Sequence, residues 1–185
     1  ALPMFPIHLV TKVDLEFIPS NYKDLTGDKS AMDAIICFKT ADGKDGFIAI
    51  ETKYSENLGT NEASNTDKAI ETIRQLSCFN SDFEERINKK QTKLTQIYRN
   101  FLLSERYGLW IGAESYSIVL SPELHPSTDD EVLSVTNEMR PEYKGKLQSI
   151  TLESFTNKLI SESPEEYAEI FRRFRDRYLS FDRVE

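Results

Sequence analysis

The sequence contains few of the residues on which disulfide frameworks and zinc sites depend. Its 185 residues include two cysteines, Cys37 and Cys78, and two histidines, His8 and His125. Two cysteines are too few for a disulfide framework, and their spacing does not match a zinc site. Neither histidine has a neighbour in the sequence that marks it as a metal ligand or a catalytic base.

Long apolar runs and several familiar catalytic motifs are also missing. No stretch approaches the roughly 20 apolar residues that span a bilayer, and no charged-then-apolar leader is present. There is no Gly-rich phosphate loop, Gly-X-Ser-X-Gly or His-Glu-X-X-His motif, so enzymes of those classes have no support. A cytoplasmic protein is expected. The start at Ala1 rather than methionine suggests a trimmed chain.

The composition is that of an ordinary globular protein. With 39% hydrophobic and 29% charged residues, residues 1–185 are expected to form one domain, which can be the C-terminal part of a longer chain. The net charge of −8 argues against coating nucleic acid by bulk electrostatics. Net charge does not say where the basic residues lie, however.

Apolar periodicity predicts a mixture of strands and helices. The segments 31–40 and 46–54 have apolar residues at successive positions, as central strands covered on both faces do. Strands are expected over 11–18, 31–40, 46–54, 116–120 and 147–152, and helices over 67–79, 81–106, 129–139, 153–160 and 164–178.

Two of these helices carry capping signals. Ser81 with Glu84, and Ser163 with Glu166, have the spacing of a capping box. The apolar residues of the last helix recur at helical spacing and are expected to face inward; they are Tyr167, Ile170, Phe171, Phe174 and Tyr178. Basic residues lie off the apolar stripe of the helix 81–106, where they form either a solvated face or a surface for phosphates; they are Arg86, Lys89, Lys90, Lys93 and Arg99.

The stretch 30–56 places three charged residues at the ends of apolar segments. Asp33 opens the first segment, and Glu51 and Lys53 close the second after a turn that bears Gly and Asp. In a β-hairpin the start of one strand lies beside the end of the next, so Asp33 is expected close to Glu51. Side chains alternate along a strand, so Glu51 and Lys53 share a face.

Two neighbouring carboxylates repel each other, and a hard divalent cation such as Mg²⁺ relieves that repulsion through oxygen ligands. Such a metal lowers the pKa of a bound water and offsets charge on a phosphate. Lys53 would then orient the water and stabilise the developing oxyanion. The alternative is an ordinary salt bridge at the end of the sheet, which does not explain why three charges interrupt apolar strands at adjoining ends.

The pattern of Asp33, a hairpin and Glu51-Thr52-Lys53 resembles the PD-(D/E)XK nuclease superfamily, and more narrowly the domains of this type in bacterial proteins. The resemblance implies an α/β, restriction-endonuclease-like core, with a mixed central β-sheet flanked by helices in the order α-β-β-β-α-β. It also implies that Asp33 and Glu51 bind Mg²⁺ or Mn²⁺, with the backbone carbonyl of Thr52 as a further ligand, and that Lys53 is the catalytic lysine.

The sequence departs from this family pattern in two places. Met32 stands where the family name has a proline, and no counterpart of the first core helix precedes Val10. That helix either lies before the sequence given or is replaced by its short start. Glu16, on the first expected strand, is a candidate substitute for the acid that the helix often contributes.

Some nucleases of this superfamily carry a Gln-X-X-X-Tyr element on the helix after the third strand. Gln75 to Phe79 gives Gln-X-X-X-Phe, and Gln96 with Arg99 is a second candidate polar pair. Surface or capping roles are the alternative for each.

The leading hypothesis is a Mg²⁺-dependent nuclease that hydrolyses phosphodiester bonds in DNA. The cations Arg86, Lys89, Lys90 and Lys93 would contact phosphates beside the site. The alternative is a non-catalytic module that keeps the fold and binds nucleic acid or protein, which the overall acidity and the missing helix support.

Overall fold

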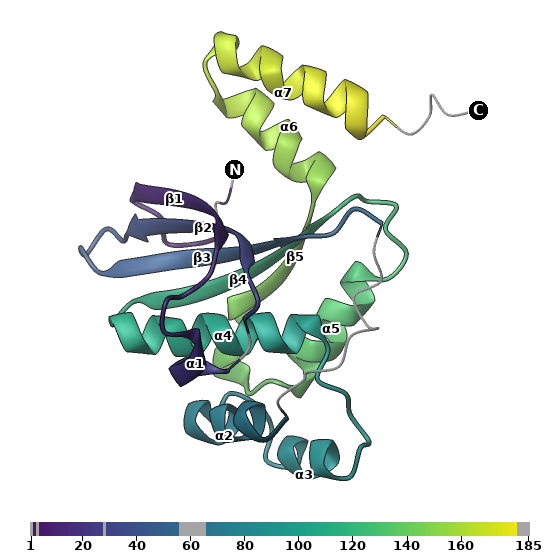
Figure 1. The fold of residues 1–185 in the computed structure, drawn as a ribbon. Coiled ribbons are helices and arrows are strands. Elements are labelled where there is room, and N and C mark those ends of the chain that lie inside the picture. Colours follow the sequence, from purple (N-terminus) through teal and green to yellow (C-terminus); the bar gives the residue numbers. More distant parts are fainter. Residues whose placement is uncertain (1, 3, 28, 56–65, 181–185) are drawn as a thin grey trace.

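The computed structural model describes residues 2, 4–27, 29–55 and 66–180. Its centre is a five-stranded sheet in the order β1-β2-β3-β4-β5 (Figure 1). The strands are β1 (Leu9–Phe17), β2 (Met32–Lys39), β3 (Asp45–Thr52), β4 (Glu114–Ser121) and β5 (Leu147–Thr151).

The sheet is mixed, as expected. β1, β2 and β3 form an antiparallel meander, whereas β4 and β5 run parallel to β3. A tight turn joins β2 to β3, and Gly43 has the left-handed φ of 83° that this turn requires. Parallel strands need a long crossover, and the helices between β3 and β4 supply it.

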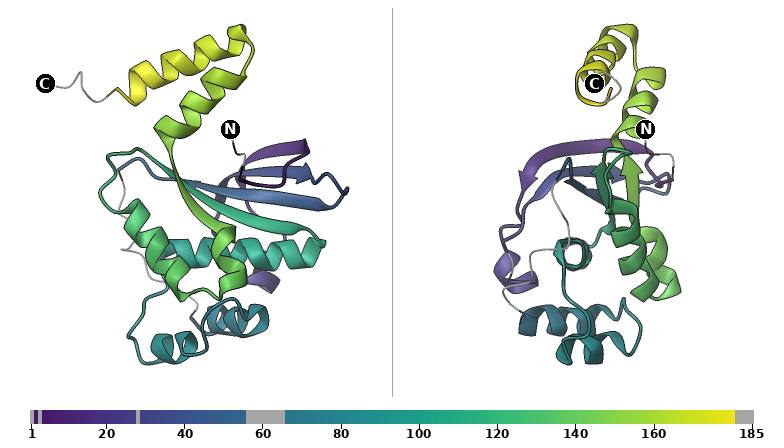
Figure 2. Two further views of the ribbon diagram at one scale, coloured as in Figure 1. Left: turned by 180° about the vertical axis from the view of Figure 1, so that it is seen from behind. Right: turned by 90° about the vertical axis from the view of Figure 1, so that its right-hand side faces the viewer.

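Helices cover the two faces of the sheet unequally (Figures 1 and 2). On one face, α4 packs against the sheet with α1, α2, α3 and α5 around it, and a large apolar core fills this side. On the other face, the start of α6 packs with Leu2 and Phe5. The helices are α1 (Tyr22–Leu25), α2 (Thr66–Leu76), α3 (Phe83–Asn88), α4 (Gln96–Ile111), α5 (Thr128–Glu138), the 3₁₀ helix η1 (Pro141–Lys146), α6 (Leu152–Glu162) and α7 (Glu165–Tyr178).

The expectation of one long helix over 81–106 is wrong. The chain breaks after α3, where Lys90 has a φ of 57°, and α4 begins at Gln96. The helices on either side of the break have different partners, since Arg86 of α3 forms an ion pair with Glu138 of α5 while α4 packs on the sheet. One straight helix could not satisfy both contacts. The N-cap residue of α3 is Asp82, and its side chain makes no capping hydrogen bond. Ser81 therefore does not form the expected capping box.

Helix α4 ends at Ile111, and a glycine follows it two residues before β4 begins. Gly112 takes a left-handed φ of 69°, and its N–H bonds to the carbonyl of Gly108. A Cβ on Gly108 would lie 2.9 Å from the carbonyl oxygen of Ala113, so this close turn into β4 needs glycine there. The strand therefore starts at Glu114.

The last helix does not turn its apolar stripe inward. Ala168 and Leu179 are buried, whereas Tyr167, Ile170 and Phe174 are exposed. Helix α7 packs chiefly on α6, and this pair projects from the body of the molecule (Figure 1). Its N-cap is Pro164 without a side-chain hydrogen bond, so the expected capping box is also not formed.

No helix precedes β1 among residues 2 and 4–8. Phe5 instead packs on the sheet, with its ring 5.0 Å from that of Tyr116. Among the described helices, none combines the length and hydropathy needed to cross a bilayer.

Candidate active site

The hairpin brings Asp33 and Glu51 across from each other. Ala34 pairs with Ile50 in the antiparallel ladder, so the next residues outward, Asp33 and Glu51, are also opposite. Oδ2 of Asp33 accepts hydrogen bonds from the backbone N–H and the hydroxyl of Thr52, both at 2.6 Å. The carboxylate of Asp33 is thereby tied to the end of β3.

Glu51 is buried, with 7% of its surface exposed, and it accepts hydrogen bonds from helix α4. Nε2 of Gln96 donates to Oε1 at 2.6 Å, and Nδ2 of Asn100 donates to Oε2 at 2.9 Å. The two amides are four residues apart, which places them on one face of the helix. Both oxygens of the carboxylate are therefore fixed in position.

Lys53 completes the cluster. Its Nζ lies 2.7 Å from Oε1 of Glu51, and only 11% of the lysine side chain is exposed. The three charges that interrupt the apolar strands thus meet at one end of the sheet, as the hairpin pattern predicts. A salt bridge, the alternative explanation, accounts for the contact between Lys53 and Glu51. It does not account for Asp33, whose carboxylate accepts hydrogen bonds from Thr52.

A family model of the PD-(D/E)XK nuclease superfamily matches residues 2–180. The chain belongs to this superfamily. The match spans the sheet, the helices on both of its faces and the α6–α7 pair. Neither a curated protein nor a solved structure matches the chain significantly.

Members of this superfamily are usually nucleases that use divalent metals, and the fold agrees with the mixed sheet predicted for it. The residues predicted to form the superfamily's motif lie on the hairpin, with Asp33 on β2 and Glu51-Thr52-Lys53 at the end of β3.

Burial controls the electrostatics of this site. It raises the pKa of Glu51, because a carboxylate loses hydration in the interior. The nearby charge of Asp33 raises that pKa further, whereas the hydrogen bonds from Lys53 and Asn100 lower it. The pKa of Glu51 is raised overall, so burial and repulsion from Asp33 outweigh the hydrogen bonds from Lys53 and Asn100. A cation beside Asp33 and Glu51 would relieve this cost.

The remaining acceptor capacity fits such a cation. A carboxylate oxygen accepts about two hydrogen bonds. Oδ2 of Asp33 and Oε1 of Glu51 each have two donors, while Oε2 of Glu51 has one. This leaves Oδ1 of Asp33 and part of Oε2 of Glu51, which are hard oxygen ligands of the kind Mg²⁺ prefers.

The protein offers this cation few ligands. Across the described residues, no group of three or more His, Cys, Asp or Glu side chains is arranged to hold a metal. Mg²⁺ is often bound by one or two carboxylates, with water and substrate phosphate completing the shell. Asp33 and Glu51 match that mode, and the carbonyl of Thr52 stays a predicted further ligand.

Glu16, the candidate third acid, lies on β1. Leu15 pairs with Ala34 and Phe17 with Met32, so Glu16 falls across from Asp33 along the sheet. Its φ is 51°, a left-handed conformation that costs a non-glycine residue about 1 kcal/mol. Glu16 is exposed, and among the described residues no hydrogen bond or ion pair joins its side chain to Asp33.

The supporting polar residues are only partly those that the sequence suggested. Gln96 reaches Glu51, but its partner there is Asn100 rather than Arg99. Gln75 lies on α2, where it donates to Glu71 at 3.0 Å on the surface. Sequence reasoning missed Asn100, although its spacing of four from Gln96 was the available signal.

A small cavity of about 20 Å³ lies behind Glu51. Glu51, Asn100 and Ser117 are among its lining residues. Oδ1 of Asn100 and Oγ of Ser117 are buried without a hydrogen-bond partner. The cavity has about the size that one water molecule needs.

Arg86 and Lys89, which were proposed to contact phosphates, form ion pairs with acidic residues of the protein. Arg86 is held by Glu138, with Nη1 2.7 Å from Oε1, and by Asp82 at 3.1 Å. Lys89 pairs with Glu85 in the next turn of α3. Lys90 and Lys93 lie on the connection between α3 and α4, and Lys93 is three residues before Gln96. The four cations therefore do not form one face of one helix.

Proposed function

We propose that the protein is a metal-dependent nuclease that hydrolyses phosphodiester bonds in DNA. Asp33 and Glu51 hold Mg²⁺ or Mn²⁺, and Lys53 assists the attacking water. The observation that carries this proposal is the convergence of Asp33, Glu51 and Lys53 at one end of the sheet, with Nζ of Lys53 2.7 Å from Glu51.

Each residue has a defined task in this proposal. A bound divalent cation lowers the pKa of a coordinated water and offsets the charge of the scissile phosphate. Oδ1 of Asp33 and Oε2 of Glu51 supply ligands. Lys53 hydrogen-bonds the water or a phosphoryl oxygen, and its positive charge stabilises the developing oxyanion.

Other residues position these groups. Thr52 holds Asp33 through two hydrogen bonds, and Gln96 and Asn100 hold Glu51. A metal site requires ligands that cannot rotate away, and hydrogen-bonded partners of ligands typically change metal affinity or activity by about 10–100-fold when mutated. Thr52 and Asn100 are therefore positioning residues.

Binding of DNA must be local, because the chain has a net charge of −8. Arg86 and Lys89 are neutralised by Glu138 and Glu85. We therefore assign phosphate contact to Lys90, on the segment that leads into α4.

The test is cleavage of plasmid, linear and single-stranded DNA, and of RNA, with Mg²⁺ or Mn²⁺. The native chain is expected to cut DNA, whereas Lys53→Ala loses cleavage and keeps its folded circular dichroism spectrum. Lys44→Ala is the matched control, because Lys44 pairs with Asp42 in the exposed β2–β3 turn. The proposal fails if the native protein leaves every substrate intact and behaves like Lys53→Ala throughout.

The alternative is a non-catalytic module that binds nucleic acid or protein. It is favoured by the closed contacts of Glu51, whose Oε1 already has two donors. DNA binding without cleavage, unchanged by Asp33→Asn or by removal of divalent metal, would support this alternative instead.

A further inference from the structure

Helix α7 presents an apolar stripe to solvent. Tyr167, Ile170, Phe174 and Tyr178 are 52%, 59%, 39% and 47% exposed. At about 100° per residue, these four side chains lie within about 80° of one another around the helix. The rings of Phe174 and Tyr178 are in contact, with centroids 5.3 Å apart. An exposed apolar patch of this kind on a helix marks an interaction surface.

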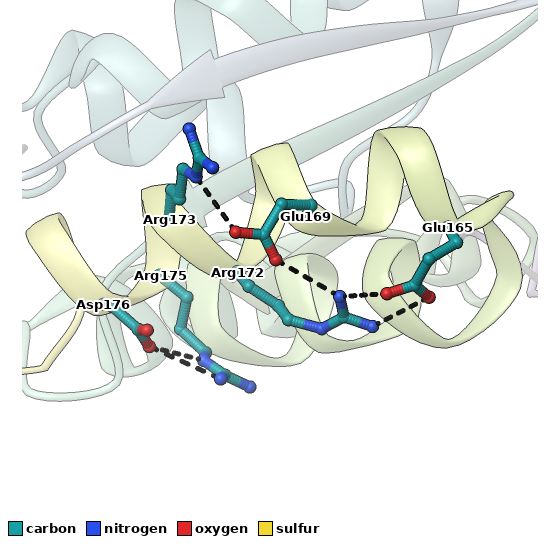
Figure 3. Close-up of polar contacts among 6 residues, drawn as sticks. All are labelled: Glu165, Glu169, Arg172, Arg173, Arg175 and Asp176. Atoms are coloured by element: carbon teal, nitrogen blue, oxygen red, sulfur yellow. Dashed lines mark hydrogen bonds and ion pairs between the residues drawn. The ribbon is translucent and has the colours of Figure 1, made fainter.

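Most charged residues of α7 have partners within the helix (Figure 3). Arg172, for example, donates from Nη1 to Oε1 of Glu165 at 2.7 Å. The residues in this network are Glu165, Glu169, Arg172, Arg173, Arg175 and Asp176. Because they are paired with one another, they leave little net positive charge on α7 for a polyanion.

Glu166 and Arg177 are the exceptions. Neither forms an ion pair with another residue in the described part of the chain, and both are exposed. The guanidinium of Arg177 lies 5.3 Å from the ring centroid of Tyr178. Eleven positions apart, Glu166 and Arg177 lie on the same border of the stripe and about 16 Å apart along the axis. They therefore mark its two ends with opposite charges.

This arrangement is complementary to itself. When two copies of α7 pack antiparallel and cross near Arg172, Tyr167 of one copy meets Tyr178 of the other, and Ile170 meets Phe174. The same register sets Glu166 of each copy beside Arg177 of the other. A two-fold axis then produces every contact twice, as in an isologous interface. A parallel arrangement would place like charges together.

From this geometry we infer that the chain forms a two-fold dimer in which the apolar stripes of two α7 helices pack antiparallel and reciprocal Glu166–Arg177 ion pairs close the ends. The inference goes beyond the proposed nuclease activity and does not depend on it. Its occupant is a second copy, because the apolar contacts and the opposite charges of Glu166 and Arg177 match in one register.

The area suits a reversible dimer. Large aromatic side chains bury about 150–250 Å² each when fully covered. Covering the exposed half of the three aromatic side chains and of Ile170 therefore removes roughly 350 Å² per copy, or about 700 Å² in all. A standard stable interface buries about 1,200–2,000 Å². The stripe supplies about half of this, and its polar borders add to it, so the dimer is expected to dissociate on dilution.

The test is sedimentation equilibrium of the full chain over a wide range of concentration. The native chain is expected to be a dimer that dissociates on dilution, and Phe174→Glu is expected to be monomeric. Leu124→Glu is the control, since Leu124 is an exposed apolar residue outside α7. Circular dichroism checks that each variant is folded.

Charge reversal tests the register. Glu166→Arg and Arg177→Glu are each expected to weaken the dimer at least about tenfold, because like charges then meet. The double variant restores native affinity. A monomeric native chain overturns the inference, and so does a dimer that Phe174→Glu leaves intact. A monomer that Phe174→Glu destabilises would show that the stripe is covered within its own chain. Failure of the double variant to recover affinity overturns the antiparallel register.

Discussion

The hydrogen bond from Asn100 to Glu51 can be measured directly through its dependence on pH. Replacing Asn100 with leucine removes the amide that donates to Oε2 at 2.9 Å. A hydrogen bond to a charged group contributes about 1.5–3 kcal/mol, and one between neutral groups about 0.5–1.5 kcal/mol. The loss should therefore be larger while Glu51 is ionised.

The stability loss is expected to be larger at high pH, because the pKa of Glu51 is raised. At pH 8 the buried carboxylate is charged, so Asn100→Leu is expected to lower the free energy of unfolding by about 2 kcal/mol. At pH 4, below the ordinary value of 4.5, Glu51 is protonated in the folded state. The deficit should then shrink to about 1 kcal/mol. Oδ1 of Asn100, which lacks a partner, contributes equally at both pH values.

Urea denaturation at the two pH values provides the measurement. Gln75→Leu is the matched control, because Gln75 donates to Glu71 in the same chemical pair on an exposed surface. That variant should change the free energy of unfolding by less than about 0.5 kcal/mol. An Asn100→Leu deficit of the same size at pH 8 and pH 4 would refute the assignment of this bond to the ionised carboxylate.

Two further predictions concern buried charge. Lys146→Met leaves the carboxylate of Glu105, whose side chain is 5% exposed, without its cation at 3.0 Å. The free energy of unfolding should fall by about 3 kcal/mol, which is the lower end for a buried pair, because Lys146 is partly exposed. Adding Glu105→Gln to the Lys146→Met variant should recover most of this loss. A Lys146→Met variant as stable as the native protein would contradict the prediction. Mn²⁺ should raise the melting temperature more at pH 8 than at pH 5, because protons compete with the metal for Glu51, whose pKa is raised. Scanning calorimetry measures the melting temperature, and Asp33→Asn should abolish the rise. An equal rise in that variant would exclude Asp33 as a ligand.

The position of Asn100 explains part of what the sequence could not provide. Asp33, Glu51 and Lys53 lie on one hairpin, so local alternation and strand pairing are enough to bring them together. Asn100 reaches Glu51 from a helix 49 positions away along the chain. Its orientation depends on how α4 packs against the sheet.

The α3–α4 break and the α7 stripe show the same dependence on packing. The apolar residues of 81–106 predict one helix, but in the structure α3 and α4 are separate helices with different partners, and Arg86 of α3 pairs with Glu138 of α5. The apolar spacing of α7 predicts an amphipathic helix, without saying what its stripe meets. In the structure, α7 packs on α6 through Ala168 and leaves Phe174 exposed.

The sequence by itself determined the central hairpin, the mixed sheet through its resemblance to the superfamily, and the three charged residues of the candidate site. These follow from alternation and from contacts between neighbours in the chain, which a pattern of side chains encodes. Only the tertiary structure decided which amides hold Glu51, which cations are neutralised and which face of α7 is exposed. Those features depend on contacts between distant elements, whose relative placement is set by packing of the whole core.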